Sequence, residues 1–223
     1  MIEEINLETD KDRIRERLVK YTRRAFHLLP ELHKPYILDI GCGSGVPTIE
    51  LAKLSDGQII GLDTDSKALT IFRNKVDKYG LSERIKVIEQ SMLDMDFPDE
   101  SFDIIWAEGS ISGIGFKNGL EQWQRFIKPK GFIVVHDEVG DIDDKINQVS
   151  NCGYDLLDYF ILGKDVWWNE YFALLEKLII KTRTKYKNNP AVIRLINTDE
   201  KYIDMFRANP EQYCSVYFIM KRK

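Results

Sequence analysis

The chain has 223 residues, of which 43% are hydrophobic and 30% are charged, so it can bury one substantial core. Its net charge of −4 offers no overall basic field for a polyanion, which disfavours nucleic acid as a partner. No apolar stretch approaches the roughly 18 residues of a membrane span, and Met1 to Asp10 is acidic, unlike a signal peptide. We therefore expect a cytoplasmic single domain over residues 1–223, with an insertion and no membrane partner.

The three cysteines, Cys42, Cys152 and Cys214, are widely separated and form no C-x-x-C pair. This spacing excludes a disulfide framework and a zinc site. No cluster of His, Asp and Glu marks a metal, so no metal site is predicted. We expect Cys42 to be a small residue that fills a tight space rather than a reactive thiol.

The first predicted element is a charged, amphipathic helix from Asp10 to Leu29. Its apolar stripe consists of Ile14, Leu18, Tyr21 and Ala25. Residues 1–30 are expected to precede the sheet and to form a helical cover over the ligand pocket.

A short apolar run, Tyr36 to Ile40, carries Asp39 and leads into glycines at 41, 43 and 45. It predicts a buried strand followed by a loop whose backbone can approach a ligand closely, and a helix from Val46 to Leu54. The glycine spacing is G-x-G-x-G rather than G-x-G-x-x-G, and no G-x-x-x-x-G-K-[ST] loop occurs. A pyrophosphate-binding loop is therefore disfavoured.

Apolar runs and helical segments alternate from Tyr36 to Val135, with one helix predicted at Lys67 to Tyr79. This alternation predicts a doubly wound α/β fold, in which a parallel sheet has helices on both faces. Ligands bind at the carboxyl ends of the strands in such sheets. The residues that fall near these ends are Asp39, Asp63, Ser91, Ala107 and His136.

The pattern changes after Val139, and we expect a substrate region at 140–205. Within it, Tyr154 to Leu162 resembles a strand and Val166 to Thr184 a long helix; a last strand follows at 212–221. Aromatic residues cluster at helical spacing at Trp167, Trp168, Tyr171 and Phe172. They fit either core packing or the roof of a substrate pocket.

The ordered motifs over residues 36–138 resemble those of the class I S-adenosylmethionine-dependent methyltransferases. The matching segments are Leu38 to Gly45, Ile59 to Asp63, Ile85 to Met92, Phe102 to Glu108, and Phe126 to Val135. A further match, Glu108 to Ile111 followed by Ile114 to Phe116, resembles a subgroup of small, mostly uncharacterised bacterial and archaeal members. The resemblance implies a Rossmann-like, mostly parallel seven-stranded sheet with an antiparallel last strand.

The same resemblance implies a set of cofactor contacts. Asp63 would bind the ribose hydroxyls, with Thr64 or Asp65 as substitutes if the alignment slips. Ser91 and Met92 would contact the adenine; the family usually has an acid where Ser91 stands, and Asp94 is the fallback. The remaining cofactor-binding residues would be Asp39, Gly41, Gly43, Gly45 and Ala107.

Two residues near the expected methyl group are candidate catalytic residues. A carboxylate at Glu108 could attract the cationic sulfonium, orient an acceptor or act as a general base. The imidazole of His136 could take a proton from the acceptor. A structural hydrogen-bonding role for Glu108 and a partly solvated loop position for His136 are the competing interpretations.

The sequence therefore predicts methyl transfer from S-adenosyl-L-methionine to a small molecule, with S-adenosyl-L-homocysteine as the product. A methyltransferase for protein or RNA is the first alternative. A nicotinamide-dependent oxidoreductase and a non-catalytic cofactor-binding module are the others. A homo-oligomer is compatible with the sequence, and the acceptor atom is left open.

Overall fold

The computed structural model describes residues 2–223, which form two compact units. We call one the sheet unit; it comprises Lys20–Ile161 and Ser215–Lys223. The other, the helical unit, comprises Leu162–Cys214 together with the N-terminal segment up to Val19. Every site residue predicted from the sequence lies in the sheet unit.

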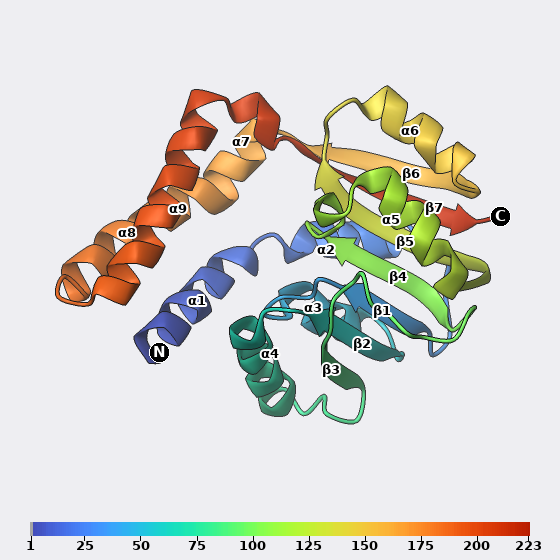
Figure 1. Cartoon of the computed structure of the whole chain (residues 1–223), viewed down its shortest axis with the longest axis horizontal. Helices are drawn as coiled ribbons and strands as arrows, with labels where there is room; N and C mark the ends of the chain where they lie inside the picture. Colours follow the sequence, from blue (N-terminus) through green and yellow to red (C-terminus); the bar gives the residue numbers. More distant parts are fainter. Residues whose placement is uncertain (1) are drawn as a thin grey trace. The chain divides into compact units, whose positions relative to one another are not determined.

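A seven-stranded sheet forms the centre of the sheet unit (Figure 1). Its strands are β1 (Tyr36–Ile40), β2 (Gln58–Asp63), β3 (Ile85–Glu89), β4 (Phe102–Glu108), β5 (Ile127–Glu138), β6 (Tyr154–Leu162) and β7 (Ser215–Arg222). They lie in the order β3-β2-β1-β4-β5-β7-β6, with β1 to β5 parallel and β7 antiparallel to β5. This confirms the predicted mostly parallel sheet with an antiparallel last strand.

The order of the strands reverses between β1 and β4. The chain runs outward from β1 through β2 to β3, and then returns to place β4 on the other side of β1. Ligands of open α/β sheets bind at such a switch point, beyond the carboxyl ends of the strands. Asp39 pairs in register with Trp106 here, so the glycine loop after β1 and Glu108 at the end of β4 are neighbours.

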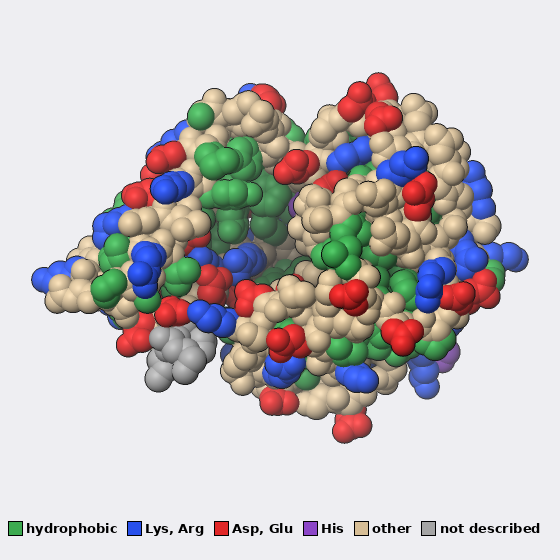
Figure 2. Space-filling view, viewed as in Figure 1, with side chains coloured by type: hydrophobic (Ala, Val, Ile, Leu, Met, Phe, Trp, Pro, Cys, Tyr) green, Lys and Arg blue, Asp and Glu red, His purple; other side chains and the backbone are tan. Residues whose placement is uncertain are grey.

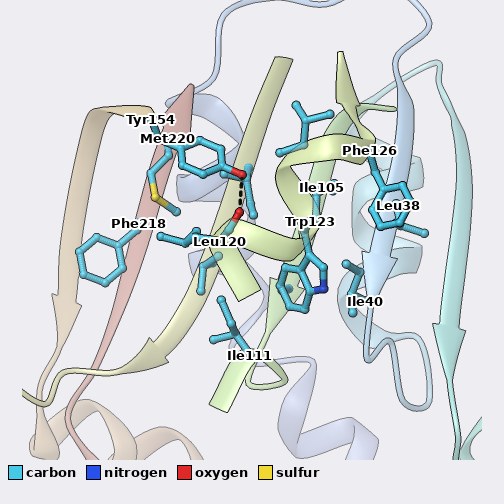
Figure 3. Close-up of a cluster of buried hydrophobic side chains, with 14 of the residues drawn as sticks. Leu38, Ile40, Ile105, Ile111, Leu120, Trp123, Phe126, Tyr154, Phe218 and Met220 are labelled. Carbon is cyan, nitrogen blue, oxygen red and sulfur yellow. Dashed lines mark hydrogen bonds between the residues drawn. The ribbon is translucent and has the colours of Figure 1, made fainter. Parts of the chain in front are cut away.

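Helices pack against the sheet because its strands are apolar on both faces. They are α2 (Val19–His27), α3 (Val46–Leu54), α4 (Ser66–Lys78), α5 (Phe116–Trp123) and α6 (Ile142–Asn151). On one face, Leu38 and Ile105 of the sheet pack with Leu120 and Trp123 of α5 (Figure 3). In the same core, the hydroxyl of Tyr154 donates a hydrogen bond to the Leu120 carbonyl over 2.9 Å.

Helices also make up the second unit. They are α1 (Ile2–Arg15), α7 (Lys164–Trp167), the π-helical turn η3 (Trp168–Phe172), α8 (Ala173–Lys185), α9 (Pro190–Ala208) and the 3₁₀ turn η4 (Pro210–Tyr213). The ring of Phe172 is buried and lies 4.3 Å from that of Phe206, which also stacks on Trp168. These contacts favour the core-packing interpretation of the aromatic cluster.

The predicted helix from Asp10 to Leu29 is wrong, because the structure has two helices there, α1 and α2. At the break the backbone hydrogen bonds reach three residues back instead of four: Arg17 N–H donates to the Ile14 carbonyl and Leu18 N–H to the Arg15 carbonyl. No glycine or proline marks the break, so the apolar stripe seemed continuous. Within residues 2–223, no helix is both long and apolar enough to cross a membrane.

The predicted substrate region is divided in the structure. Its first part contains α6 and β6, which belong to the sheet unit, whereas the part from α7 through α9 belongs to the helical unit. The proposed roles of residues 1–30 as a cover and of residues 140–205 in substrate binding stay predictions.

Candidate active site

The glycine loop lies between β1 and α3 and is tied to the neighbouring strand. The N–H groups of Gly41 and Cys42 both donate to the Leu62 carbonyl, over 2.8 and 3.0 Å. Positive φ angles of 74°, 52° and 76° at Gly41, Gly43 and Gly45 explain why glycine is needed at alternate positions. A Cβ on Gly43 would meet nothing within 4 Å, so the loop borders open space there.

Asp63 ends β2 and points its carboxylate at this loop. One oxygen, Oδ2, accepts the Gly43 N–H over 2.8 Å, and the other, Oδ1, accepts the Asp65 N–H over 2.9 Å. The side chain therefore connects β2 to the glycine loop. A carboxylate has about four acceptor sites, so Asp63 can still accept bonds from a ligand.

Asp39 is buried beneath the loop, where the Thr48 hydroxyl of α3 donates to its Oδ2. Burial raises the pKa of Asp39 to about 7, and the nearby carboxylates of Glu108 and Asp63 add to the increase. The bond from Thr48 acts in the opposite direction. Asp39 therefore lies where a cationic ligand would relieve the repulsion between three acidic groups.

Because the pKa of Asp39 is higher in the folded than in the unfolded state, folding takes up a proton between about pH 4 and pH 7. Stability should therefore decrease as pH rises through this window. We expect Asp39→Asn to remove this decrease, so that its Tm rises relative to wild type between about pH 5 and pH 8. Thermal unfolding of both proteins measures the difference; parallel Tm curves would contradict the prediction.

Glu108 ends β4 and is surrounded by uncharged donors. The indole N–H of Trp106 donates to its Oε1 over 2.8 Å, and the hydroxyls of Thr22 and Tyr217 lie near enough to its carboxylate to lower its pKa. Burial raises the pKa of Glu108, whereas these three donor groups act in the opposite direction. None of Asp39, Asp63 and Glu108 forms an ion pair within the sheet unit, in which residues 20–161 and 215–223 are all described.

His136 pairs in register with Glu108 across β4 and β5. Its Nε2 lies 2.7 Å from the Ser215 hydroxyl, and its ring stacks on Tyr217 at 4.3 Å. Burial lowers the pKa of His136 to about 4, so the imidazole is neutral at pH 7. A group with so low a pKa is a weak base at neutral pH, which favours Glu108 over His136 as the proton acceptor.

The adenine-side candidates lie next to Asp63. The Gln90 N–H donates to the Asp63 carbonyl over 3.0 Å, which places the turn after β3 beside the end of β2. Within that turn, the Ser91 hydroxyl accepts the Leu93 N–H over 3.1 Å, while Met92 packs at the border of the core. Ala107 is completely buried in β4, so its side chain serves the core.

Three residues that the sequence did not single out contact the site: Thr48, Thr22 and Tyr217. Thr48 lies in the first turn of α3, where its hydroxyl reaches back to Asp39.

Burial and nearby acidic groups raise the pKa of the Cys42 thiol, as expected for a packing residue. Within residues 2–223, no group of three or more His, Cys, Asp and Glu could hold a metal ion.

Residues 37–131 match a family model described as a methyltransferase domain. Strands β2 to β4, the glycine loop and the acid at the end of β2 all lie within this segment. This segment is therefore similar to the class I S-adenosylmethionine-dependent methyltransferases. Asp39, Asp63 and Glu108 are inside the matched methyltransferase domain, whereas Thr22, His136 and Tyr217 are outside it.

Curated relatives align with this methyltransferase domain over part of their length. A sterol 24-C-methyltransferase of Eremothecium gossypii is 26% identical over 132 residues, which are 53% of this chain and 35% of the relative. The 27-O-demethylrifamycin SV methyltransferase of Amycolatopsis mediterranei is 26% identical over 125 residues, or 56% of this chain and 46% of the relative. The matched region thus spans less than half of each relative.

A solved structure is similar over most of the chain. It is a SAM-dependent methyltransferase from Geobacter sulfurreducens in complex with S-adenosyl-L-homocysteine, with a TM-score of 0.75 and 15% identity. The alignment covers 93% of this chain and 91% of that chain. At this identity the similarity shows that the fold is shared.

Proposed function

We propose that this protein binds S-adenosyl-L-methionine in the sheet unit and transfers its methyl group to a small-molecule acceptor. The observation that carries the proposal is the convergence of a glycine loop with three carboxylates, Asp39, Asp63 and Glu108, at the switch point of the sheet. Such a site suits a ligand that has ribose hydroxyls and a positive charge. The Geobacter sulfurreducens protein is in complex with S-adenosyl-L-homocysteine, which has the ribose hydroxyls but lacks the sulfonium charge.

The chain's residues fit the cofactor in three places. Gly43 borders open space, so the loop can lie against the ligand without a Cβ in the way. Asp63 has acceptor capacity left for two ribose hydroxyls. Ser91 and Met92 lie beside it for the adenine, with the serine hydroxyl replacing the usual acid.

When bound, the cofactor supplies an activated methyl group on a cationic sulfur, whose leaving group is a neutral thioether. The acceptor's lone pair forms the new bond to carbon while the electrons of the carbon–sulfur bond remain on sulfur. The protein has to align the two partners and exclude water. Glu108 would accept the acceptor's proton when the acceptor carries one, and its negative charge would favour the sulfonium.

A small-molecule acceptor is proposed because the curated relatives' names are those of sterol and rifamycin methyltransferases. On the face shown in Figure 2, the described basic and acidic side chains are interspersed rather than gathered in a basic stripe. Methyl transfer to protein or RNA remains the first alternative, and a non-catalytic cofactor-binding module the second. A cytoplasmic location and a homo-oligomeric state stay predictions.

Methyl-labelled S-adenosyl-L-methionine incubated with a cell extract tests the proposal. We expect the wild-type protein to label the small-molecule fraction, and Asp63→Ala to label it much less. Label in the protein or RNA fraction alone would support the first alternative. If the cofactor binds but no fraction is labelled, the proposed transfer is contradicted.

Glu108→Gln should weaken binding of S-adenosyl-L-methionine about tenfold and leave S-adenosyl-L-homocysteine nearly unchanged. The reason is that only the first ligand carries a sulfonium, whose positive charge the carboxylate attracts. Calorimetric titration with both ligands at pH 8 gives the ratio of affinities. Glu138→Gln, an exposed position at the end of β5, is the matched control. An equal loss of affinity for both ligands would show that Glu108 does not attract the sulfonium.

A further inference from the structure

Three elements bring hydrogen-bond donors to the carboxylate of Glu108. Trp106 belongs to the same strand, Thr22 comes from α2 and Tyr217 from β7. The side chains of Thr22 and Tyr217 are almost completely buried, with residue exposures of 1% and 2%. Burying a hydroxyl without a hydrogen-bond partner costs free energy. Because both hydroxyls lie near the same carboxylate, few arrangements of these side chains keep every polar group paired.

The ring of Tyr217 is fixed on both of its faces. It stacks on His136 at 4.3 Å with an interplanar angle of 19°, and on Phe160 at 4.9 Å with an angle of 15°. The Arg24 guanidinium lies 3.9 Å from the centroid of the Phe160 ring and extends this column. A tyrosine ring stacked on both faces has little freedom to move, and its hydroxyl lies near the carboxylate of Glu108.

The hydroxyl of Tyr217 keeps its proton at neutral pH. Burial and the charge of Glu108 raise the pKa of Tyr217 well above its ordinary value, so the group acts as a donor. The Thr22 hydroxyl lies near both Tyr217 and Glu108, so the three side chains form one polar cluster. Further titratable groups lie nearby. Asp39 is close to Glu108, Tyr21 is close to Tyr217, and the neutral imidazole of His136 stacks on the Tyr217 ring.

We propose that Tyr217 and Thr22 are positioning residues that hold the carboxylate of Glu108 in one orientation at the end of β4 by donating hydrogen bonds to it. What Glu108 then acts on, the sulfonium and the acceptor, rests on the proposed function. The two residues lie outside the matched methyltransferase segment, so they supply the site from the flanking parts of the chain. They need not touch either substrate.

Carbon-13 NMR of protein labelled at the glutamate side-chain carboxyl measures the titration of Glu108 directly. The Glu108 signal is assigned by its loss in Glu108→Gln, and aspartates such as Asp39 give no signal. In Tyr217→Phe and in Thr22→Val we expect the midpoint of Glu108 to move upward by about one pH unit, because each loses a bond to the charged form. Thr22→Ser keeps the hydroxyl and should restore the wild-type midpoint.

Tyr154→Phe is the matched control, because it also removes a buried tyrosine hydroxyl but one that bonds to the Leu120 carbonyl. It should leave the Glu108 midpoint unchanged. Unchanged midpoints in folded Tyr217→Phe and Thr22→Val would overturn the proposal; if one variant does not fold, the other decides. The titration uses the ligand-free protein, so failure to bind S-adenosyl-L-methionine would count against the proposed function alone.

Discussion

Asp63→Ala should lower the affinity for S-adenosyl-L-methionine by about a hundredfold or more. We propose that the carboxylate binds two ribose hydroxyls, and hydrogen bonds to charged groups contribute about 1.5–3 kcal/mol each. The substitution also removes the acceptor of the Gly43 N–H, so the glycine loop loses one of its connections to β2. Calorimetric titration of wild type and variant measures the loss.

Asp65→Ala is the control for this experiment. Asp65 caps α4 by accepting the N–H groups of Lys67 and Ala68, and its removal should cost about 1 kcal/mol of stability. It should not affect cofactor affinity if Asp63 is the ribose ligand. The reverse result, with Asp65→Ala weakening binding and Asp63→Ala not, would move the ribose site to Asp65.

Gly45→Ala should be among the most destabilising single substitutions in the glycine loop. Gly45 has a φ of 76°, and a Cβ there would lie 2.0 Å from Cδ2 of the buried Phe72 ring. Left-handed backbone strain costs about 1–3 kcal/mol and overpacking about 1–3 kcal/mol more, so we expect a loss of about 2–6 kcal/mol. Denaturant unfolding measures the free energy of unfolding.

The matched control separates strain from overpacking. Gly80 also has a positive φ, of 65°, but a Cβ there would meet nothing within 4 Å. Gly80→Ala should therefore show only the backbone cost, clearly smaller than that of Gly45→Ala. If the two substitutions cost the same, close packing of the loop against Phe72 is not what requires glycine at position 45.

Local patterns predicted the parts of the fold that surround the glycine loop. The apolar run at 36–40 and the helix at 46–54 coincide with β1 and α3, because a buried parallel strand and a proline-started helix both have clear local signatures. The break between α1 and α2 has no such signature. Neither has the division into two units, which depends on packing between distant segments.

The environment of Glu108 shows what the sequence could not supply. Its place at the end of a strand follows from the apolar run at 102–107, whereas its partners Thr22 and Tyr217 come from opposite ends of the chain. His136 was a candidate base because it is near the pocket, but burial, which is a tertiary effect, lowers its pKa and makes it neutral. Such effects depend on three-dimensional contacts that no local pattern records.

The most direct test of the central claim is calorimetric titration of the wild-type protein with S-adenosyl-L-methionine and S-adenosyl-L-homocysteine. NAD and NADP are titrated in parallel because other folds that combine a strand, a glycine loop and a helix bind them. We predict that the first two ligands bind and that the nicotinamides do not. Binding of the nicotinamides alone, or of none of the four, would contradict the assignment of this site to S-adenosyl-L-methionine.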